Sequence, residues 1–258
     1  MAVQPLTEEE IRRYARHIVL PEMGGVGQTR LKLASVLVIG AGGLGSPLLL
    51  YLAAAGVGRI GVVDDDRVDP SNLQRQILFS TEAEGRAKAE AALETLRRLN
   101  PLVELEAHTL RLGAANAAEL VAGYDLVADG SDNLATRLAV HDACRSFGRT
   151  LVSASVQGLD GQLTTYKAHL GSPHPCLRCF VDPETGEEAL PSCAQAGVLG
   201  PVAGVLGTLQ AVEVVKELAG IGTSLSGTIL LYDAAAANFD RLRLRRRAAC
   251  DSRDCMFA

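Results

Sequence analysis

The first 156 residues alternate between short β-branched runs and longer stretches in which apolar residues recur at helical spacing. The run "SVLVIG" at 35–40 predicts a buried parallel strand, and "LGSPLLLYLAAAG" at 44–56 predicts the helix that follows it. Further strands are predicted at 59–66, 103–110, 124–130 and 150–156, and further helices at 6–18, 84–101 and 132–148. This alternation predicts a Rossmann-like, doubly wound α/β fold with a mostly parallel sheet and helices on both faces.

The pattern changes after residue 156. An extended strand is predicted at 161–169, and residues 170–197, rich in Pro, Gly and Cys, lack periodicity and predict a long crossing loop. A long apolar helix at 198–220 and two strands at 227–233 and 238–245 predict a C-terminal antiparallel extension. We treat 1–258 as a single domain, with an N-terminal helical arm at 1–30, a nucleotide-binding part at 31–156 and a remainder at 157–258.

Composition narrows the class of protein. The chain has 258 residues, a net charge of −5 and 48% hydrophobic residues, which fits a globular protein and argues against nucleic-acid binding. The charged N-terminus lacks an apolar signal core, so we expect a cytoplasmic protein. Residues 33–58 carry no charge, but their six glycines favour a buried strand, turn and helix over a membrane span. Without export, the six cysteines point to metal ligation or thiol chemistry rather than disulfides.

A glycine motif follows the first predicted strand. Gly40, Gly42 and Gly45 form G-x-G-x-x-G at a helix N-terminus, where backbone N–H groups suit phosphate. Asp64 ends the next strand, at the place of a carboxylate that holds a ribose hydroxyl. These features are compatible with the binding of NAD, FAD or ATP. For the glycine motif alone, the alternative is a tight turn that binds no ligand.

The segment "DPSNLQRQILF" at 69–79 favours ATP. Asn72 and Arg75 can reach phosphate oxygens, Lys88 adds a second cation, and Asp132 ends another strand on the same rim. Cations, a glycine turn and a carboxylate for magnesium make a triphosphate site, which an oxidoreductase does not need.

Six motifs occur in an order that resembles one family. They are "GAGGLGSP", "DDDRVDPSNLQRQ", "GRAKAEAA", "DGSDN", "CLRC" and "GVLGPVAGVLGTLQAVEVVK". From Arg13 to Cys255 the chain resembles the MoeB/ThiF/HesA family, bacterial relatives of ubiquitin-activating enzymes. The resemblance implies an adenylyltransferase that uses ATP and Mg to activate the C-terminal glycine of a ubiquitin-fold sulfur carrier ending in Gly-Gly. A separate sulfur donor then displaces AMP, for molybdopterin, thiamin or tRNA thiolation; the sequence leaves the pathway open.

The resemblance also implies roles for residues. Those placed at the nucleotide are Gly40, Gly42, Gly43, Asp64, Asp66, Ser71, Asn72, Leu73, Gln74, Arg75, Lys88, Asp132 and Asn133. Asp64 takes the ribose, the segment from Ser71 to Arg75 and Lys88 contact the phosphates, and Asp132 with Asn133 holds magnesium and the adenosine side. Arg16 matches an arginine that reaches a neighbouring subunit's site, which implies a homodimer with shared active sites. An exposed helix arginine is the alternative.

Cysteines form the last set of candidates. Cys176 and Cys179 form a C-x-x-C pair, and Cys250 with Cys255 is the candidate second pair of a structural zinc site. The family has C-x-x-C there, so the four residues between Cys250 and Cys255 are a departure. Cys193 matches a cysteine that can bond covalently to the carrier in some relatives. Unreactive thiols remain the alternative at all five positions, and Cys144 is expected in the core.

Three other functions stay open. The motif "SNLQRQ" argues against an NAD-type oxidoreductase. A zinc-held scaffold without catalysis would be expected to have lost residues of the ATP site. A relative that adenylates a non-protein carboxylate, a peptide or a tRNA base is the third, and the cysteines argue against it.

Overall fold

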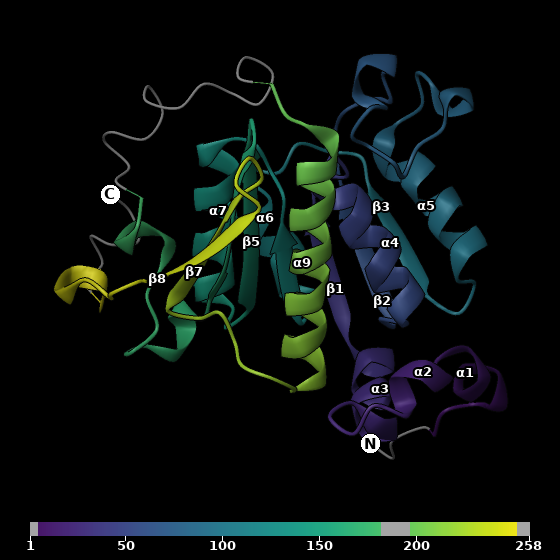
Figure 1. Cartoon of the computed structure of the whole chain (residues 1–258), viewed down its shortest axis with the longest axis horizontal. Coiled ribbons are helices and arrows are strands. Elements are labelled where there is room, and N and C mark those ends of the chain that lie inside the picture. The colour runs from purple at the N-terminus through teal and green to yellow at the C-terminus, as the bar shows by residue number, and fades with distance from the viewer. Residues whose placement is uncertain (1–4, 182–196, 252–258) are drawn as a thin grey trace.

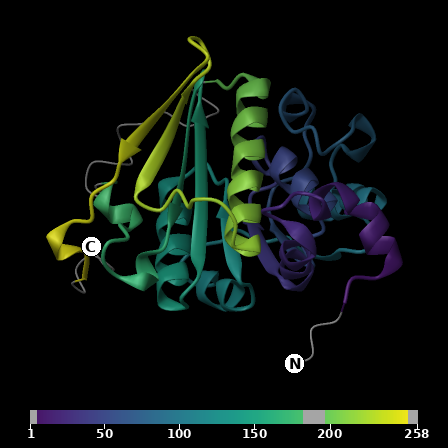
Figure 2. The ribbon, with the colours of Figure 1, turned by 60° about the horizontal axis from the view of Figure 1, so that its bottom comes forward.

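A single eight-stranded sheet forms the centre of the computed structural model, which describes residues 5–181 and 197–251. Its strand order is β3-β2-β1-β4-β5-β6-β7-β8, parallel from β3 to β5 and antiparallel from β5 to β8 (Figure 1). The strands are β1 (Ser35–Ile39), β2 (Arg59–Val63), β3 (Glu104–His108), β4 (Leu126–Asp129), β5 (Thr150–Gln157), β6 (Asp160–Tyr166), β7 (Thr228–Asp233) and β8 (Asn238–Arg243). The fold class expected from the sequence is confirmed, including the antiparallel extension, whose β7–β8 hairpin forms one edge of the sheet (Figure 2).

Helices cover both faces of the sheet, so all five residues of β1 are buried. One face packs against α4 (Gly45–Ala55), α5 (Lys88–Leu99) and α9 (Gly200–Ala219). The other packs against α6 (Ala117–Ala122) and α7 (Leu134–Ser146). Helix α9 lies along α4 and spans β4, β5 and β6 (Figure 1), which joins the parallel and antiparallel halves.

The N-terminal arm comprises α1 (Glu8–Arg13), α2 (Ala15–Ile18) and α3 (Gly24–Leu33). A capping box between Thr7 and Glu10 begins α1, but the helix predicted at 6–18 is divided at Tyr14. The Tyr14 ring packs on Gly56, and its hydroxyl accepts a hydrogen bond from Asn100 at 2.8 Å. Because α3 leads directly into β1, the arm lies at the amino end of the strands, opposite the glycine turn (Figure 1).

Helix α5 begins at Lys88, four residues later than predicted. Gly85 has a positive φ of 77°, and the segment around it pairs with Arg67 and Val68 instead of joining the helix. Five short 3-10 turns complete the described chain: η1 (Pro70–Asn72), η2 (Thr81–Ala83), η3 (Ala168–Leu170), η4 (Leu177–Cys179) and η5 (Ala248–Asp251). Among the described residues, no helix is both long and apolar enough to cross a lipid bilayer.

Candidate nucleotide site and cysteine cluster

The glycine turn lies between the carboxyl ends of β1 and β4, where strand order reverses and α/β proteins bind ligands. Gly40 has a φ of +85° and donates its N–H to Val63 O at 2.8 Å. A Cβ on Gly45 would lie 1.9 Å from the Gly40 oxygen, so no other residue fits there. The turn therefore brings backbone N–H groups and the first turn of α4 to one point, as a phosphate site requires.

Asp64 supports this turn. Its Oδ2 accepts the Ala41 N–H at 2.8 Å, and its Oδ1 accepts the Asp66 N–H at 2.9 Å. Burial raises the pKa of Asp64 above its usual value, against the opposing effect of the Ala41 hydrogen bond and the Lys88 charge. Each carboxylate oxygen keeps a further lone pair, so a ribose hydroxyl could still donate to it.

Lys88 is the first residue of α5, and its side chain is buried. Its ammonium lies 2.8 Å from Asp66 Oδ2, and its backbone N–H donates to Asp66 O. The carboxylate oxygens of Asp64, Asp65 and Asp66 lie within 4.8 Å of one another, so this cation offsets an acidic cluster. The structure thus places the expected cation beside the expected ribose carboxylate.

The segment 71–76 ("SNLQRQ"), which begins in η1 and is called the η1 motif below, packs against the glycine turn. Asn72 Oδ1 accepts hydrogen bonds from Arg75 Nη2 at 2.8 Å and from Gln76 Nε2 at 3.1 Å. A Cβ on Gly43 would meet Arg75 Cγ at 3.4 Å, which places the Arg75 side chain beside the turn. A Cβ on Gly200 would lie 2.4 Å from Gln74 O, so the start of α9 supports the motif from behind.

Other residues of this motif have structural contacts. The Ser71 hydroxyl donates to Asp69 at 2.5 Å, and Leu73 packs against the main apolar cluster. Gln76 is 3% exposed, and its Oε1 has no hydrogen-bond partner among the described residues. Sequence reasoning missed Gln76, although it lies inside "SNLQRQ".

Asp132 does not end a strand as predicted, because β4 ends at Asp129; it lies in the loop that follows, next to the glycine turn. The loop begins at Gly130, whose N–H donates to Ile39 O at 3.0 Å, and the Asp132 side chain is exposed. Asn133 Oδ1 accepts the Thr136 N–H at 2.9 Å and so caps α7. Arg16 is exposed on α2, on the arm at the other end of the sheet, so one chain does not bring it to these residues.

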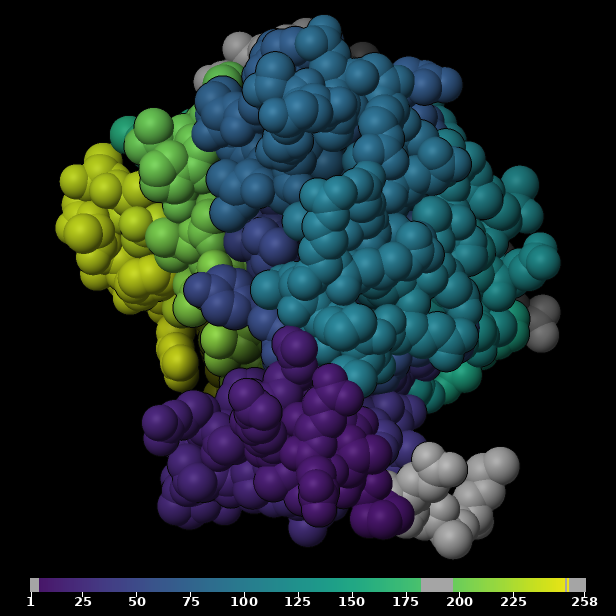
Figure 3. Space-filling model, turned by 90° about the vertical axis from the view of Figure 1, so that its right-hand side faces the viewer, coloured from purple at the N-terminus to yellow at the C-terminus, as the bar shows by residue number. Residues whose placement is uncertain are grey.

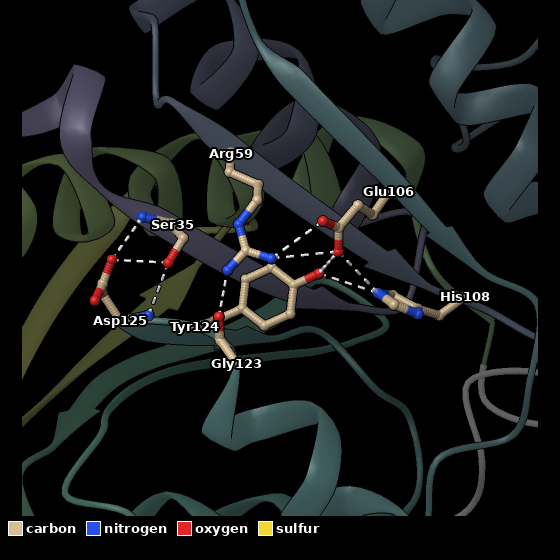
Figure 4. A network of polar contacts seen from close by, with 7 residues as sticks. All are labelled: Ser35, Arg59, Glu106, His108, Gly123, Tyr124 and Asp125. Carbon is tan, nitrogen blue, oxygen red and sulfur yellow. Dashed lines mark hydrogen bonds and ion pairs between the residues drawn. The ribbon is translucent and has the colours of Figure 1, made fainter.

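A second polar network lies between β1–β3 and the start of β4 (Figure 4). Arg59 pairs with Glu106 at 3.1 Å and lies 4.3 Å above the centre of the Tyr124 ring, and Tyr124 donates to Glu106 at 2.6 Å. Burial and the Glu106 contact raise the pKa of Tyr124. His108 joins it through Nε2, 3.0 Å from the Tyr124 hydroxyl, and the His108 carbonyl accepts the Asp64 N–H. Sequence reasoning missed this network, which fixes the strand leading to Asp64.

A cluster of three cysteines joins the segment around η4 to η5. The sulfur atoms of Cys176, Cys179 and Cys250 lie within 4.8 Å of one another, and those of Cys176 and Cys179 are 3.6 Å apart. Burial alone would raise the pKa of the Cys179 thiol, but hydrogen bonds, first that from the Arg247 backbone, lower it overall. Three thiols at this spacing suit a tetrahedral zinc ion.

The other three cysteines are Cys144, Cys193 and Cys255. Cys255 and Cys193 lie outside the described residues. Cys144 lies on the buried face of α7 and is 2% exposed in the core, as expected, and burial raises the pKa of its thiol.

The parallel strands, the glycine turn and the cations beside it define a nucleotide-binding α/β protein. A model of the ThiF family matches residues 14–252, and the chain belongs to this family, as the sequence motifs indicated. It is 54% identical over 252 residues to the adenylyltransferase and sulfurtransferase MOCS3 of Bos taurus, covering 96% of this chain and 55% of that protein. It is 49% identical over 246 residues to the sulfur carrier protein adenylyltransferase of Thermus thermophilus, covering 95% of this chain and 91% of that one.

Solved structures share the fold at lower identity. A crystal structure of E. coli MccB with MccA-N7isoASN matches with a TM-score of 0.81 and 21% identity, over 93% of this chain and 74% of that one. A crystal structure of PaaA matches with a TM-score of 0.79 and 23% identity, over 96% and 76%. The chain spans about half the length of the MOCS3 relatives that it matches.

Proposed function

We propose that the chain is an ATP-dependent adenylyltransferase that activates the C-terminal glycine carboxylate of a ubiquitin-fold sulfur carrier. One observation carries this proposal: Arg75 lies beside the glycine turn, held there by Asn72, with the Asp132 loop adjoining the same turn. The relatives' names support the substrate class, since one of them is a sulfur carrier protein adenylyltransferase.

The reaction joins a carrier oxygen to the α-phosphorus of ATP and breaks the bond to the β-phosphate oxygen, which releases pyrophosphate. Negative charge grows on the phosphate oxygens in the transition state, and Arg75 and the N–H groups of the glycine turn are placed to absorb it. Asp64 orients the ribose, and Lys88 balances the carboxylates beside it. Asp132 and Asn133 would hold magnesium, which supplies further positive charge when bound.

The test is ATP–pyrophosphate exchange, with and without ubiquitin-fold carriers that end in Gly-Gly. We expect exchange that requires one carrier and is absent when its terminal glycines are deleted. Exchange without any carrier, or with a small carboxylate, peptide or tRNA only, would replace the proposed substrate. Stabilisation by NAD but not by ATP would contradict the proposal altogether.

We propose that Cys176, Cys179 and Cys250 bind a structural zinc ion, with Cys255 as the fourth ligand. The thiol donor set and its spacing support this. Cys176→Ser and Cys250→Ser are each expected to lower bound zinc from about one ion per chain to near zero, measured by mass spectrometry of the metal, and to lower Tm. Cys144→Ala is the matched control and should keep its zinc. Unchanged zinc in Cys176→Ser would refute the site.

We propose that Arg16 completes the site of a second copy, so that the enzyme is a homodimer. Arg16 lies at the opposite end of the sheet from its own glycine turn, on an arm that forms a separate lobe (Figure 3). Val19, Leu20 and Val26 of this arm are 50–70% exposed, and Tyr51 and Val212 on α4 and α9 are 56% and 52% exposed. Apolar surface of this kind favours burial against a partner.

Three further assignments complete the proposal. A separate donor supplies the sulfur, and Cys193 could bond covalently to the carrier after activation. A cytoplasmic location suits cysteines that bind a metal, because thiols stay reduced there.

A further inference from the structure

The loop that carries Asp132 is held from both sides. The Ser131 N–H donates to Asp129 Oδ1 at 2.9 Å, and the Ser131 carbonyl accepts a hydrogen bond from Arg137 Nη2. On the other side of Asp132, Asn133 is fixed as the cap of α7. The backbone on both sides of Asp132 is therefore held by hydrogen bonds to side chains.

Arg137 makes most of these connections from the first turns of α7. Besides Ser131, its Nη2 donates to Ala154 O at 2.8 Å, and its Nη1 donates to Ser153 Oγ at 3.3 Å. The rigid, planar fork of a guanidinium can serve three acceptors in fixed directions, which a lysine ammonium does not reproduce. Arg137 thus ties the Asp132 loop to the middle of β5.

Asp129 closes the network underneath. It is fully buried at the end of β4, and Ser153 Oγ lies 3.3 Å from its Oδ2. Gln210 of α9 donates to Asp129 O at 2.9 Å and to Val152 O at 3.0 Å. The loop is therefore attached to β4, β5, α7 and α9 at once.

Stability alone does not explain this arrangement. Taking the Asp129 carboxylate out of water costs several kcal/mol, and apolar residues of similar volume are often at least as stabilising. A chain of polar groups that ends beneath an exposed carboxylate is instead suited to holding that carboxylate in one place. The exposed group it serves is Asp132.

We propose that Arg137 is a positioning residue for Asp132. It does not touch the nucleotide, and it acts by fixing the peptide group between Ser131 and Asp132. The inference rests on the proposed function, in which Asp132 serves the magnesium–ATP complex.

A double-mutant cycle tests this with R137Q, D132N and the double variant. Isothermal titration of ATP with magnesium gives the affinity, and pyrophosphate exchange against magnesium concentration gives the half-saturating magnesium. Loss of charge-assisted hydrogen bonds predicts that R137Q weakens ATP affinity with magnesium about 10- to 100-fold and raises half-saturating magnesium similarly. R137K should recover part of the loss, because the charge returns without the fork.

Arg149→Gln is the matched control. Arg149 is also partly buried and donates to a backbone carbonyl, Ala122 O at 3.0 Å, but it precedes β5 at the opposite end of the sheet. Like R137Q, Arg149→Gln should lower Tm, but it should not change the dependence of pyrophosphate exchange on magnesium.

The outcomes separate the inference from the function it rests on. If Arg137 acts through Asp132, the double variant should bind ATP with magnesium no more weakly than D132N alone. Additive losses, or an R137Q that behaves as Arg149→Gln does, would overturn the inference while leaving Asp132 in place. A D132N with wild-type affinity and exchange would instead show that Asp132 is wrongly assigned, and the inference would fall with it.

Discussion

Replacing Arg75 with alanine is expected to lower carrier-dependent ATP–pyrophosphate exchange by a factor of about 100 to 1,000. The guanidinium is held beside the glycine turn by Asn72 and by the backbone of Ser71, so it is already placed where charge develops on the phosphates. Removing one such preorganised donor typically costs about 2.7–4 kcal/mol in the transition state. The loss should appear mainly in kcat, because the charge it opposes is greatest in the transition state.

Two variants separate charge from packing. Arg75→Met keeps most of the aliphatic volume beside Gly43 and should be nearly as inactive as Arg75→Ala. Arg67→Ala is the matched control, since Arg67 is exposed in the preceding loop and donates to Gly85 O. It should leave exchange unchanged. An active Arg75→Met would show that Arg75 contributes packing rather than charge, and the proposed mechanism would lose its principal cation.

Local patterns predicted most of the elements, and they picked out many of the residues that the structure brings together around the glycine turn. Buried β-branched runs specify the strands, and the glycine spacing specifies the turn, because both depend on residues close in sequence. The same reasoning was wrong on two points. It predicted one helix at 6–18 where the structure has α1 and α2, and it began α5 four residues too early. In both cases distant contacts decide: Tyr14 bonds to Asn100, and the segment at Gly85 pairs with Val68.

The contacts that support the site depend on tertiary structure. Arg137, Ser153 and Asp129 come from α7, β5 and β4, and no short-range spacing relates them. The pairing of Cys250 with Cys176 came from the family resemblance alone, since 73 residues separate them in sequence. The motif located the groups that we propose to face the nucleotide, but not the groups that hold them in place.

Helix α9 lies close to the groups that support the site because several of its residues are small. A Cβ on Gly200 would collide with Gln74 O at 2.4 Å, and one on Gly207 would lie 2.3 Å from Leu44 O. Ala203 contacts the Gly43 position, and Gln210 reaches Asp129. One helix therefore packs against the glycine turn, the η1 motif and the end of β4 that leads into the Asp132 loop, so its close approach sets their relative positions.

Gly45→Ala is expected to unfold the glycine turn and to lower both stability and ATP affinity. The added Cβ would lie 1.9 Å from the Gly40 oxygen, and Gly40 cannot move away freely, because its N–H bonds to Val63 O and Gly130 lies behind it. Overpacking of this kind costs roughly 3 kcal/mol, which corresponds to a fall in Tm of about 6–12 °C for a chain of this size. ATP affinity should fall by more than about tenfold, since the N–H groups of the turn lose their alignment.

Gly113→Ala separates this steric effect from the general cost of replacing a glycine. Nothing lies within 4 Å of a Cβ at Gly113, and the φ of Gly113 is not positive. We therefore expect Gly113→Ala to change the free energy of unfolding by no more than about 0.5 kcal/mol, with a correspondingly small change in Tm. Differential scanning calorimetry and ATP titration measure both variants. If Gly45→Ala kept the Tm and ATP affinity of Gly113→Ala, the close approach of Gly45 to Gly40 would not be what shapes the phosphate site, and the turn would have to bind ATP in another conformation.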